Sequence, residues 1–398
     1  MVILGVPNVL KHADRYLRDN LPALRRIRRH IHRNPECKYE EFATAELVER
    51  ELSSCGVPHK RVGKTGVVGL IKGVARGKTI ALRADMDALR MPELTGLPYA
   101  SVNDCMHACG HDGHTAILIG AAKILSQLRD KFAGNVKLIF QPAEEGGAGA
   151  KQLCDLGVLT APKVSAVFGL HGFNANRVGT IGVMDGPMTA CAEQFYVMVT
   201  GRGAHGAYPH KSVDPILISA RIVEALQSIV AREVDPLSPA VVTVGTIHGG
   251  TGENIIPKSV RMSGTLRSYD PDVRVQLADA VKRIVRKTAV AAGGKATVRI
   301  PEGYPATIND KASVDVIRRA GAAALGADNV VELTTPTMGA EDFSFYLQHV
   351  PGAFFRLGTG DGTGKQAPAH NPYFDFNDKA IAHGVKMFVS IVRDVLGR

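Results

Sequence analysis

Short apolar runs alternate with longer amphipathic segments along the first third of the chain. The longer segments cover residues 8–33 and 40–55 and predict helices, the first of which we expect to break or restart near Pro22. The short runs cover residues 67–71 and 79–83, and each is bounded by glycine or charged residues. Such runs predict short buried strands.

The same alternation continues after residue 110. Asp112 or Thr115 can cap a helix that runs to about Arg129, and buried strands are predicted at 136–140 and 164–170. Helices that alternate with strands indicate an α/β sheet, mixed in direction, with helices covering both of its faces.

A different pattern begins near residue 185. Strands and helices follow one another in the order β-α-β-β-α-β, which is typical of a ferredoxin-like α+β domain. The strands are predicted at 194–200, 240–247, 259–266 and 296–300, and the helices at 215–232 and 273–292. Helix–strand alternation then resumes from residue 311. We therefore predict a discontinuous catalytic domain of residues 1–184 and 304–398, interrupted by an inserted domain of residues 185–303.

Length and composition agree with two globular domains. The chain has 398 residues, which is more than one hydrophobic core usually serves. No apolar run approaches the roughly 20 residues of a membrane helix. The first seven residues are apolar only briefly, and no cleavage site follows, so we expect no signal peptide and a cytoplasmic location.

The net charge of +10 is concentrated in one predicted helix, which carries arginines at 25, 26, 28, 29 and 33. No aromatic residues are interleaved and the chain has no tryptophan, so we interpret this stretch as a solvated helix face rather than a nucleic-acid site. The six cysteines are scattered. Without an export signal, they predict free thiols and one metal ligand rather than disulfides.

Residues 107–114 hold three histidines, one cysteine and one aspartate. Imidazole, thiolate and carboxylate are the ligands that zinc and its neighbours accept. Partners for this segment could come from other predicted strand ends, where an α/β sheet presents its chemistry. Those ends carry Asp85 and Asp87, Glu144 and Glu145, His171 and, late in the chain, His370.

The paired glutamates suggest that the two carboxylates have different roles. One carboxylate can bind a metal ion while its neighbour accepts a proton from water and returns it to a leaving group. Cys109 is a candidate bridge, because two ions held close together need a shared ligand.

These segments, in this order, resemble the aminoacylase–carboxypeptidase superfamily of metallopeptidases. The closer similarity is to the branch of hippurate hydrolases, auxin-conjugate hydrolases, N-acyl-amino-acid amidohydrolases and related carboxypeptidases. It extends over nearly the whole chain. The segments that carry it are residues 83–89, 107–114, 141–146, 170–171, 203–209, 252–257, 264–267, 338–343 and 370–371.

The resemblance implies a role for each matching residue. Metal ligands are implied at Cys109, His111, Glu145, His171 and His370, which leaves His107 and His114 as supporting or packing residues and Asp112 as a helix cap. Glu144 is implied as general base and acid, Asp87 as support for a metal ligand, and His205 as the group that stabilises the oxyanion. Asp85 stands where other branches place a ligand histidine. Substrate contacts are implied at Asn254 and Arg267.

The chemistry expected from the residues agrees with that resemblance. We expect hydrolysis of the amide bond of N-acyl-L-amino acids by water activated at two divalent metal ions. Zinc is the expected metal, with manganese, cobalt or nickel as alternatives. We further expect a dimer or tetramer formed through the inserted lid domain, and neither nucleic-acid nor membrane partners.

Three alternatives remain open at this point. The chain could be a carboxypeptidase that removes C-terminal residues from short or blocked peptides. It could be a nucleic-acid-binding protein with a structural zinc, although such sites are closed and rich in thiolates. It could also be a catalytically inactive relative that serves as a scaffold, although every expected catalytic residue is present.

Overall fold

The computed structural model describes residues 6–397, and the chain forms two compact units. The first unit contains the described residues up to Gly186, together with Ile308–Thr335 and the residues from Asp342 onward. The second contains Pro187–Thr307 and Pro336–Glu341. Most of the N-terminal stretch in which we expect no signal peptide, residues 1–5, lies outside the described residues.

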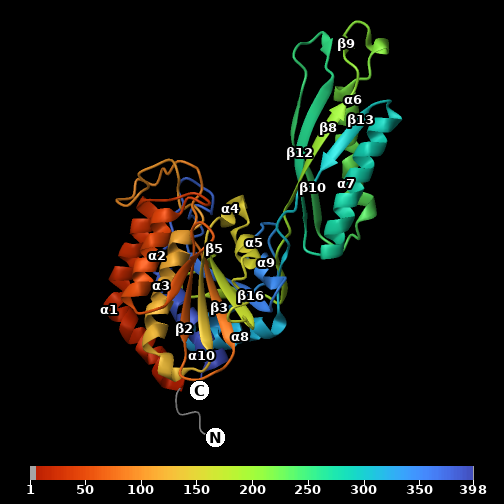
Figure 1. The fold of residues 1–398 in the computed structure, drawn as a ribbon. Coiled ribbons are helices and arrows are strands. Elements are labelled where there is room, and N and C mark those ends of the chain that lie inside the picture. The colour runs from red at the N-terminus through yellow and green to blue at the C-terminus, as the bar shows by residue number, and fades with distance from the viewer. Residues whose placement is uncertain (1–5, 398) are drawn as a thin grey trace. The chain divides into compact units, whose positions relative to one another are not determined.

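An eight-stranded mixed sheet forms the centre of the first unit (Figure 1). In sheet order its strands are β1 His59–Val62, β2 Gly66–Lys72, β4 Asn135–Gln141, β3 Thr79–Asp85, β5 Ala166–Arg177, β16 Gly352–Gly360, β6 Ile181–Val183 and β15 Val330–Glu332. β4, β3, β5 and β16 run parallel to one another, so their carboxyl ends lie at the same edge of the sheet.

Helices cover this sheet. Every residue of β3 is buried, as expected for a central strand with both faces packed. α1, α3, α8 and α10 pack together as one group, while α5 contacts α9. The helices are α1 Val6–Arg33, α2 Phe42–Ser54, α3 His111–Gln127, α4 Glu144–Gly147, α5 Gly149–Asp155, α8 Lys311–Leu325, α9 Ser344–Leu347 and α10 Ala380–Leu396. The predicted fold class is confirmed.

The second unit contains a four-stranded antiparallel sheet in the order β10-β12-β8-β13, which is the ferredoxin-like order. Residues of β8 alternate between buried and exposed, since helices pack on only one face. Asp214 and Asp270 accept hydrogen bonds from the first turns of its two helices. The elements are β8 Glu193–Thr200, α6 Pro215–Ser228, β10 Ala240–Gly249, β12 Ser259–Ser268, α7 Pro271–Ala291 and β13 Lys295–Arg299.

Two small two-stranded sheets complete the topology. One pairs β9 Ala204–His205 with β11 Ile255–Ile256, and the other pairs β7 Gly186–Thr189 with β14 Thr307–Asn309. Between residues 6 and 397, no helix is both long and apolar enough to cross a membrane.

The predicted break at Pro22 is wrong, because α1 runs without interruption from Val6 to Arg33. A proline inside a helix removes one backbone hydrogen bond. Here the proline is exposed, and the buried side chains of Leu17 and Leu24 anchor the helix to the core on both sides of it.

The expectation of free thiols is wrong for one pair of cysteines. Cys37 and Cys105 form a disulfide, with their Cα atoms 6.6 Å apart. The four free cysteines are Cys55, Cys109, Cys154 and Cys191. The two bonded residues are 68 positions apart in the sequence, and a spacing of that kind carries no signal of pairing.

Candidate metal centre

The carboxyl ends of the parallel strands bring the predicted ligands together. β3 ends at Asp85, β4 leads into the Glu144–Glu145 turn, and β5 extends past its last partner on β3 to carry His171. His111 is the first residue of α3. One edge of the sheet therefore holds the side chains that lie far apart in the sequence.

Cys109 lies at the centre of the cluster. Its Sγ belongs to two groups of three ligand atoms. One group includes His111 and His171, and the other includes Glu145 and His370. Within each group the ligand atoms lie within 4.8 Å of one another. Its Sγ lies 3.2 Å from His171 Nε2. A bridge between two ions requires a ligand common to two groups, so Cys109 stays the candidate bridge.

His370 reaches this cluster from the segment after β16. Its backbone N–H donates to the carbonyl of Ala108 at 2.8 Å, which fixes it beside Cys109. Its Nε2 lies 3.0 Å from Glu145 Oε1. The residue adopts a φ of 64°, an uncommon conformation for a side-chain-bearing residue and one that often marks functional positions.

Asp87 orients two predicted ligands at once. Its carboxylate accepts the backbone N–H of Glu145 at 2.9 Å. His111 Nδ1 lies 2.9 Å from the backbone carbonyl of Asp87 and 3.3 Å from its carboxylate, so it donates to this residue. The proton on Nδ1 leaves the His111 Nε2 lone pair facing the cluster. That nitrogen is buried and has no hydrogen-bond partner, so it fits a metal ion in that position.

His171 is held in the same ligating form. Its Nδ1 donates to the carbonyl of Gly172 at 2.7 Å, and its Nε2 points toward Cys109. Burial lowers the pKa of His171 to about 3, so the imidazole is neutral at pH 7. A neutral imidazole with one free nitrogen is the form that binds a metal ion.

A strained turn presents the two glutamates. Ala143 has a φ of 55° and Gly146 a φ of 75°, and the side chain of Glu41 accepts the N–H of Ala143 at 2.9 Å. The turn directs Glu144 and Glu145 so that their carboxylates and a nitrogen of His111 lie within 4.8 Å of one another. No pattern in the sequence points to Glu41, because a lone glutamate before a helix is not distinctive.

Asp85 does not stand alone at its strand end. His114 Nδ1 donates to Asp85 Oδ1 at 2.6 Å, and Arg83 donates to the other oxygen at 2.7 Å. The backbone N–H of Gly172 donates to His114 Nε2 at 2.8 Å. Both nitrogens of His114 are therefore occupied, and this residue links Asp85 to the strand that carries His171.

A buried arginine anchors the loop that carries Cys109 and leads into His111. Arg28 is fully buried, and its guanidinium lies 2.7 Å from Asp112, 2.8 Å from Asp375 and 3.4 Å from Asp378. It thus ties the residue next to His111 to the segment that follows His370. The interpretation of the arginine-rich helix as a solvated face is wrong for Arg28, because its side chain points into the protein.

Asp112 also proves not to be the predicted helix cap. Gly110 occupies the cap position of α3 in a left-handed conformation. The Asp112 carboxylate instead forms an ion pair with Arg28 and lies 2.8 Å from His32 Nδ1. Burial lowers the pKa of His32, but Asp112 and Glu93 outweigh it and raise the pKa to about 9.

The raised pKa of His32 predicts that the protein loses stability at alkaline pH. Because the folded-state pKa of His32 exceeds its unfolded value of about 6.5, its contribution is full below pH 6.5 and is lost as the pH rises through 9. We expect the difference in unfolding free energy between the wild type and His32→Gln to shrink by about 2 kcal/mol from pH 7 to pH 9.5.

Urea unfolding of the wild type and of His32→Gln, both with the same metal content, measures that difference in unfolding free energy. Lys137 titrates in the same range, because burial lowers its pKa to about 8, but it is present in both proteins and cancels. A difference that is independent of pH would mean that His32 is not protonated in the folded protein.

The support given by Asp87 leads to a second prediction. Asp87→Asn keeps the side-chain volume but removes the charge that orients His111 and Glu145, and changes of this kind weaken metal binding by about 10- to 100-fold. Competition with a chelator of known affinity measures the effect. Asp130→Asn, an exposed change elsewhere in the first unit, is the control, and equal affinities in the two variants would contradict the role of Asp87.

The remaining predicted residues lie in the second unit. His205 is exposed in β9, its Nδ1 accepts the N–H of Ala207 at 3.1 Å, and it pairs with Ile255, the neighbour of Asn254. Arg267 lies in β12 and lines a separate cavity of about 380 Å³ on this unit, together with Gln194, Tyr196, Thr243, Gly245, Ser263, Gly264 and Thr265. His205 lies in the two-stranded sheet of β9 and β11, and Asn254 directly precedes β11. Arg267 lies on the four-stranded sheet instead.

The chain is similar to proteins of one peptidase family over most of its length. A family model described as peptidase family M20/M25/M40 matches residues 81–394. The chain is 42% identical over 372 residues to "IAA-amino acid hydrolase ILR1-like 4" of Arabidopsis thaliana, covering 92% of this chain and 84% of that protein. It is 42% identical over 357 residues to "N-acetyl-L-cysteine deacetylase" of Bacillus subtilis, covering 89% and 84%.

Two further similarities bear on the site. The chain is 41% identical over 365 residues to "Thermostable carboxypeptidase 2" of Saccharolobus solfataricus, covering 90% of this chain and 91% of that protein. Among solved structures, the Bacillus subtilis YXEP protein, described as a dinuclear metal-binding peptidase, superposes with a TM-score of 0.82 at 34% identity, over 94% of this chain and 98% of that one.

Proposed function

We propose, because this chain belongs to peptidase family M20/M25/M40, that it hydrolyses the amide bond of N-acyl-L-amino acids. Membership of that family makes it a metal-dependent amidohydrolase. One observation carries the finer proposal. The ligand atoms of His111, Glu144 and Glu145 lie within 4.8 Å of one another, which supports Glu144 as a general base beside two candidate metal ligands.

The residues that would hold two divalent ions are Cys109, His111, Glu145, His171 and His370. This set of thiolate, imidazole and carboxylate suits zinc, and manganese, cobalt and nickel are the alternatives. When bound, the ions would polarise the amide carbonyl and lower the pKa of a water molecule.

Glu144 would move the proton. Its carboxylate accepts a proton from the attacking water and passes it to the amine nitrogen as the carbon–nitrogen bond breaks. The backbone N–H of Asp342 lies 3.4 Å from Glu144 Oε1 and helps to fix the carboxylate. The products are a carboxylic acid and a free amino acid.

Residues of the second unit would complete the reaction. His205 would donate a hydrogen bond to the developing oxyanion, and its Nε2 can do so because Nδ1 accepts from Ala207. Arg267 would pair with the substrate carboxylate, a contact that a guanidinium makes with two parallel hydrogen bonds. Asn254 would contact the substrate beside His205.

A carboxypeptidase is the second candidate, supported by the similarity to a carboxypeptidase of Saccharolobus solfataricus. A panel of acetyl- and benzoyl-amino acids and of dipeptides separates the two. We expect kcat/KM to be at least about tenfold higher for the acyl amino acids, since one well-fitted substrate group is worth about 1–3 kcal/mol. A preference for dipeptides would establish the carboxypeptidase instead.

The same panel tests the dependence on metal. Chelation should abolish turnover, and refilling with zinc should restore it more fully than manganese, cobalt or nickel. Turnover that survives complete chelation, checked by elemental analysis, would contradict the proposal.

The chain would form a dimer or tetramer through the second unit, which light scattering can test. It would act in the cytoplasm on small molecules, which fractionation can test. It would bind neither membranes nor nucleic acid.

A further inference from the structure

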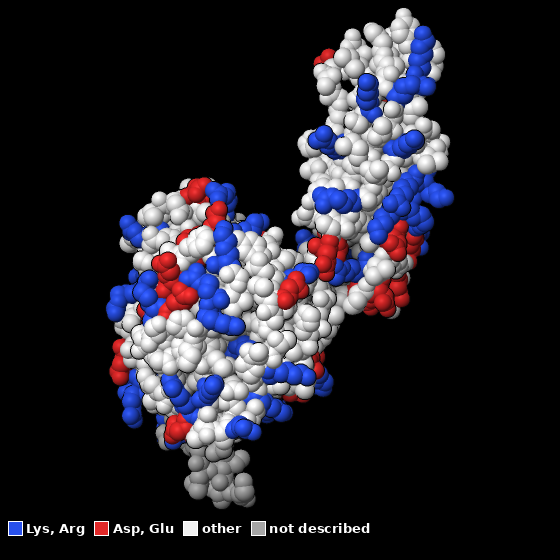
Figure 2. Space-filling view, in the orientation of Figure 1, with Lys and Arg blue, Asp and Glu red and all other residues white. Residues whose placement is uncertain are grey.

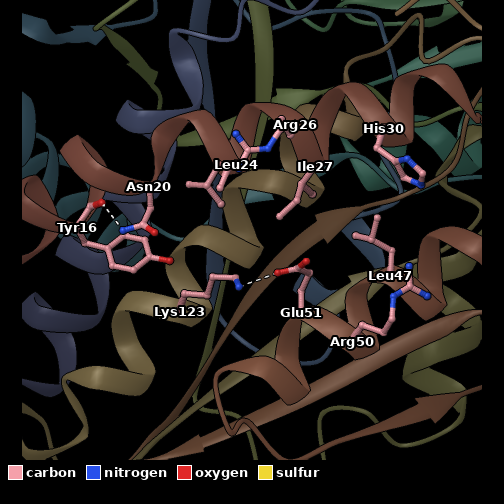
Figure 3. Close-up of a pocket in the computed structure, with 11 residues that line it drawn as sticks. Tyr16, Asn20, Leu24, Arg26, Ile27, His30, Leu47, Arg50, Glu51 and Lys123 are labelled. Carbon is pink, nitrogen blue, oxygen red and sulfur yellow. Dashed lines mark hydrogen bonds and ion pairs between the residues drawn. The ribbon is translucent and has the colours of Figure 1, made fainter.

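A second cavity lies on the first unit, in the groove between α1, α2 and α3 (Figure 3). Its volume is about 410 Å³, within the usual range of small-molecule sites. None of the residues that line it belongs to the metal cluster. The lining residues that belong to α1 recur every three or four positions, which is the spacing of one helix face. A single side of α1 therefore forms one wall of the cavity.

The base of this cavity is apolar and well packed. Leu24 and Leu47 are almost fully buried, and Ile27 lies beside them on α1. Figure 3 shows Leu24 and Ile27 pointing from α1 into the space between the helices. Because Leu24 and Leu47 keep almost no exposed surface, the apolar surface comes mainly from the partly exposed Ile27, and it favours a ligand that carries a hydrocarbon or aromatic body.

The charged groups around that base are mostly cationic. Lys123 is already paired, with its Nζ 2.7 Å from Glu51 (Figure 3). Arg26 and Arg50 also line the cavity, and neither makes an ion pair or hydrogen bond within the described part of the chain. Three cations and one anion leave a local excess of two positive charges.

α1 also carries exposed arginines outside the cavity, such as Arg15 and Arg18, but Arg26 and Arg50 are the ones that lie beside its apolar base. On the face of the first unit that is visible in Figure 2, basic and acidic side chains are interspersed. Other arginines of the unit are paired, for example Arg61 with Glu49 and Arg319 with Asp394. Two unpaired guanidinium groups at one small cavity favour a compact anion over a polyanion such as nucleic acid.

We propose that this cavity binds a small organic anion with an apolar body and one or two negative charges, carried by a carboxylate or a phosphate. The apolar body would rest on Leu24, Ile27 and Leu47, and the anionic group would pair with Arg26 and Arg50. The phenol of Tyr16 and the amide of Asn20, which also line the cavity, offer neutral hydrogen bonds.

Calorimetric titration of the metal-loaded enzyme tests this site. The probes are phenylacetate, phenyl phosphate, inorganic phosphate and the neutral phenylacetamide. We expect phenylacetate or phenyl phosphate to bind, and the stronger of the two identifies the anionic group. Inorganic phosphate and phenylacetamide should bind at least tenfold more weakly, because each lacks one half of the required chemistry.

Variants separate this site from the metal centre, which can also hold an anion. The double change Arg26→Gln and Arg50→Gln should weaken one binding event at least tenfold and leave any event at the metal centre unchanged. The control, Arg15→Gln with Arg18→Gln, removes the same charge from exposed positions of α1 outside the cavity. Unaltered binding in the first variant, or equal losses in both, would overturn the proposal.

Discussion

Glu144→Gln is expected to lower kcat by about 100- to 10,000-fold while the enzyme keeps its metal content, since general acid–base catalysis contributes a factor of this size. Glutamine has the same shape as glutamate but cannot take up a proton. Glu144 is buried in the turn after β4, and its carboxylate lies within 4.8 Å of ligand atoms of His111 and Glu145. The loss should appear in kcat rather than in substrate binding.

Glu145→Gln is the matched control for that experiment. It makes the same chemical change one residue later, at a position we propose to ligate metal, so it should reduce metal content as well as turnover. Elemental analysis and steady-state kinetics on both variants distinguish the two roles. Near-normal turnover in Glu144→Gln would remove Glu144 from proton transfer, and loss of metal from it would make Glu144 a ligand.

The parts of this site that could be predicted from the sequence share one physical reason. Parallel strands bring their carboxyl ends to one edge of a sheet, so chemistry-bearing residues that follow strands are expected to meet. Glu145, in the turn after β4, and His171, in the part of β5 beyond its last partner on β3, follow that rule, whereas Cys109 lies in the loop that leads into α3. The strands and helices of the second unit were equally readable, because short apolar runs and segments of helical spacing follow one another there in the order β-α-β-β-α-β.

The parts that could not be predicted depend on side-chain direction. Arg28 is one of five arginines between residues 25 and 33, and nothing in that run distinguishes the one that points inward. Its partners, Asp112 and Asp375, are far away in the sequence. For the same reason, Asp112 looked like a helix cap, since an aspartate at the start of a helical pattern usually is one.

Arg28→Met should destabilise the first unit by about 3 kcal/mol, the range seen when one partner of a buried ion pair is removed. Methionine fills a similar volume but leaves Asp112 buried beside His32 alone. It also releases Asp375, in the segment after His370, from its contact with α1. We therefore expect weaker metal binding together with the lower unfolding free energy, measured by chelator competition and by urea unfolding.

Arg29→Met provides the comparison, because Arg29 is the next residue of α1 and also contacts Asp378, at 2.7 Å, but its side chain is 48% exposed. Exposed pairs contribute about 0–1 kcal/mol, so this variant should stay close to the wild type in both measurements. Similar losses in the two variants would show that the charge of α1, rather than the buried contact, stabilises the loop. A loss confined to Arg28→Met, with metal affinity reduced in parallel, would show that burial makes this arginine the anchor of the metal centre.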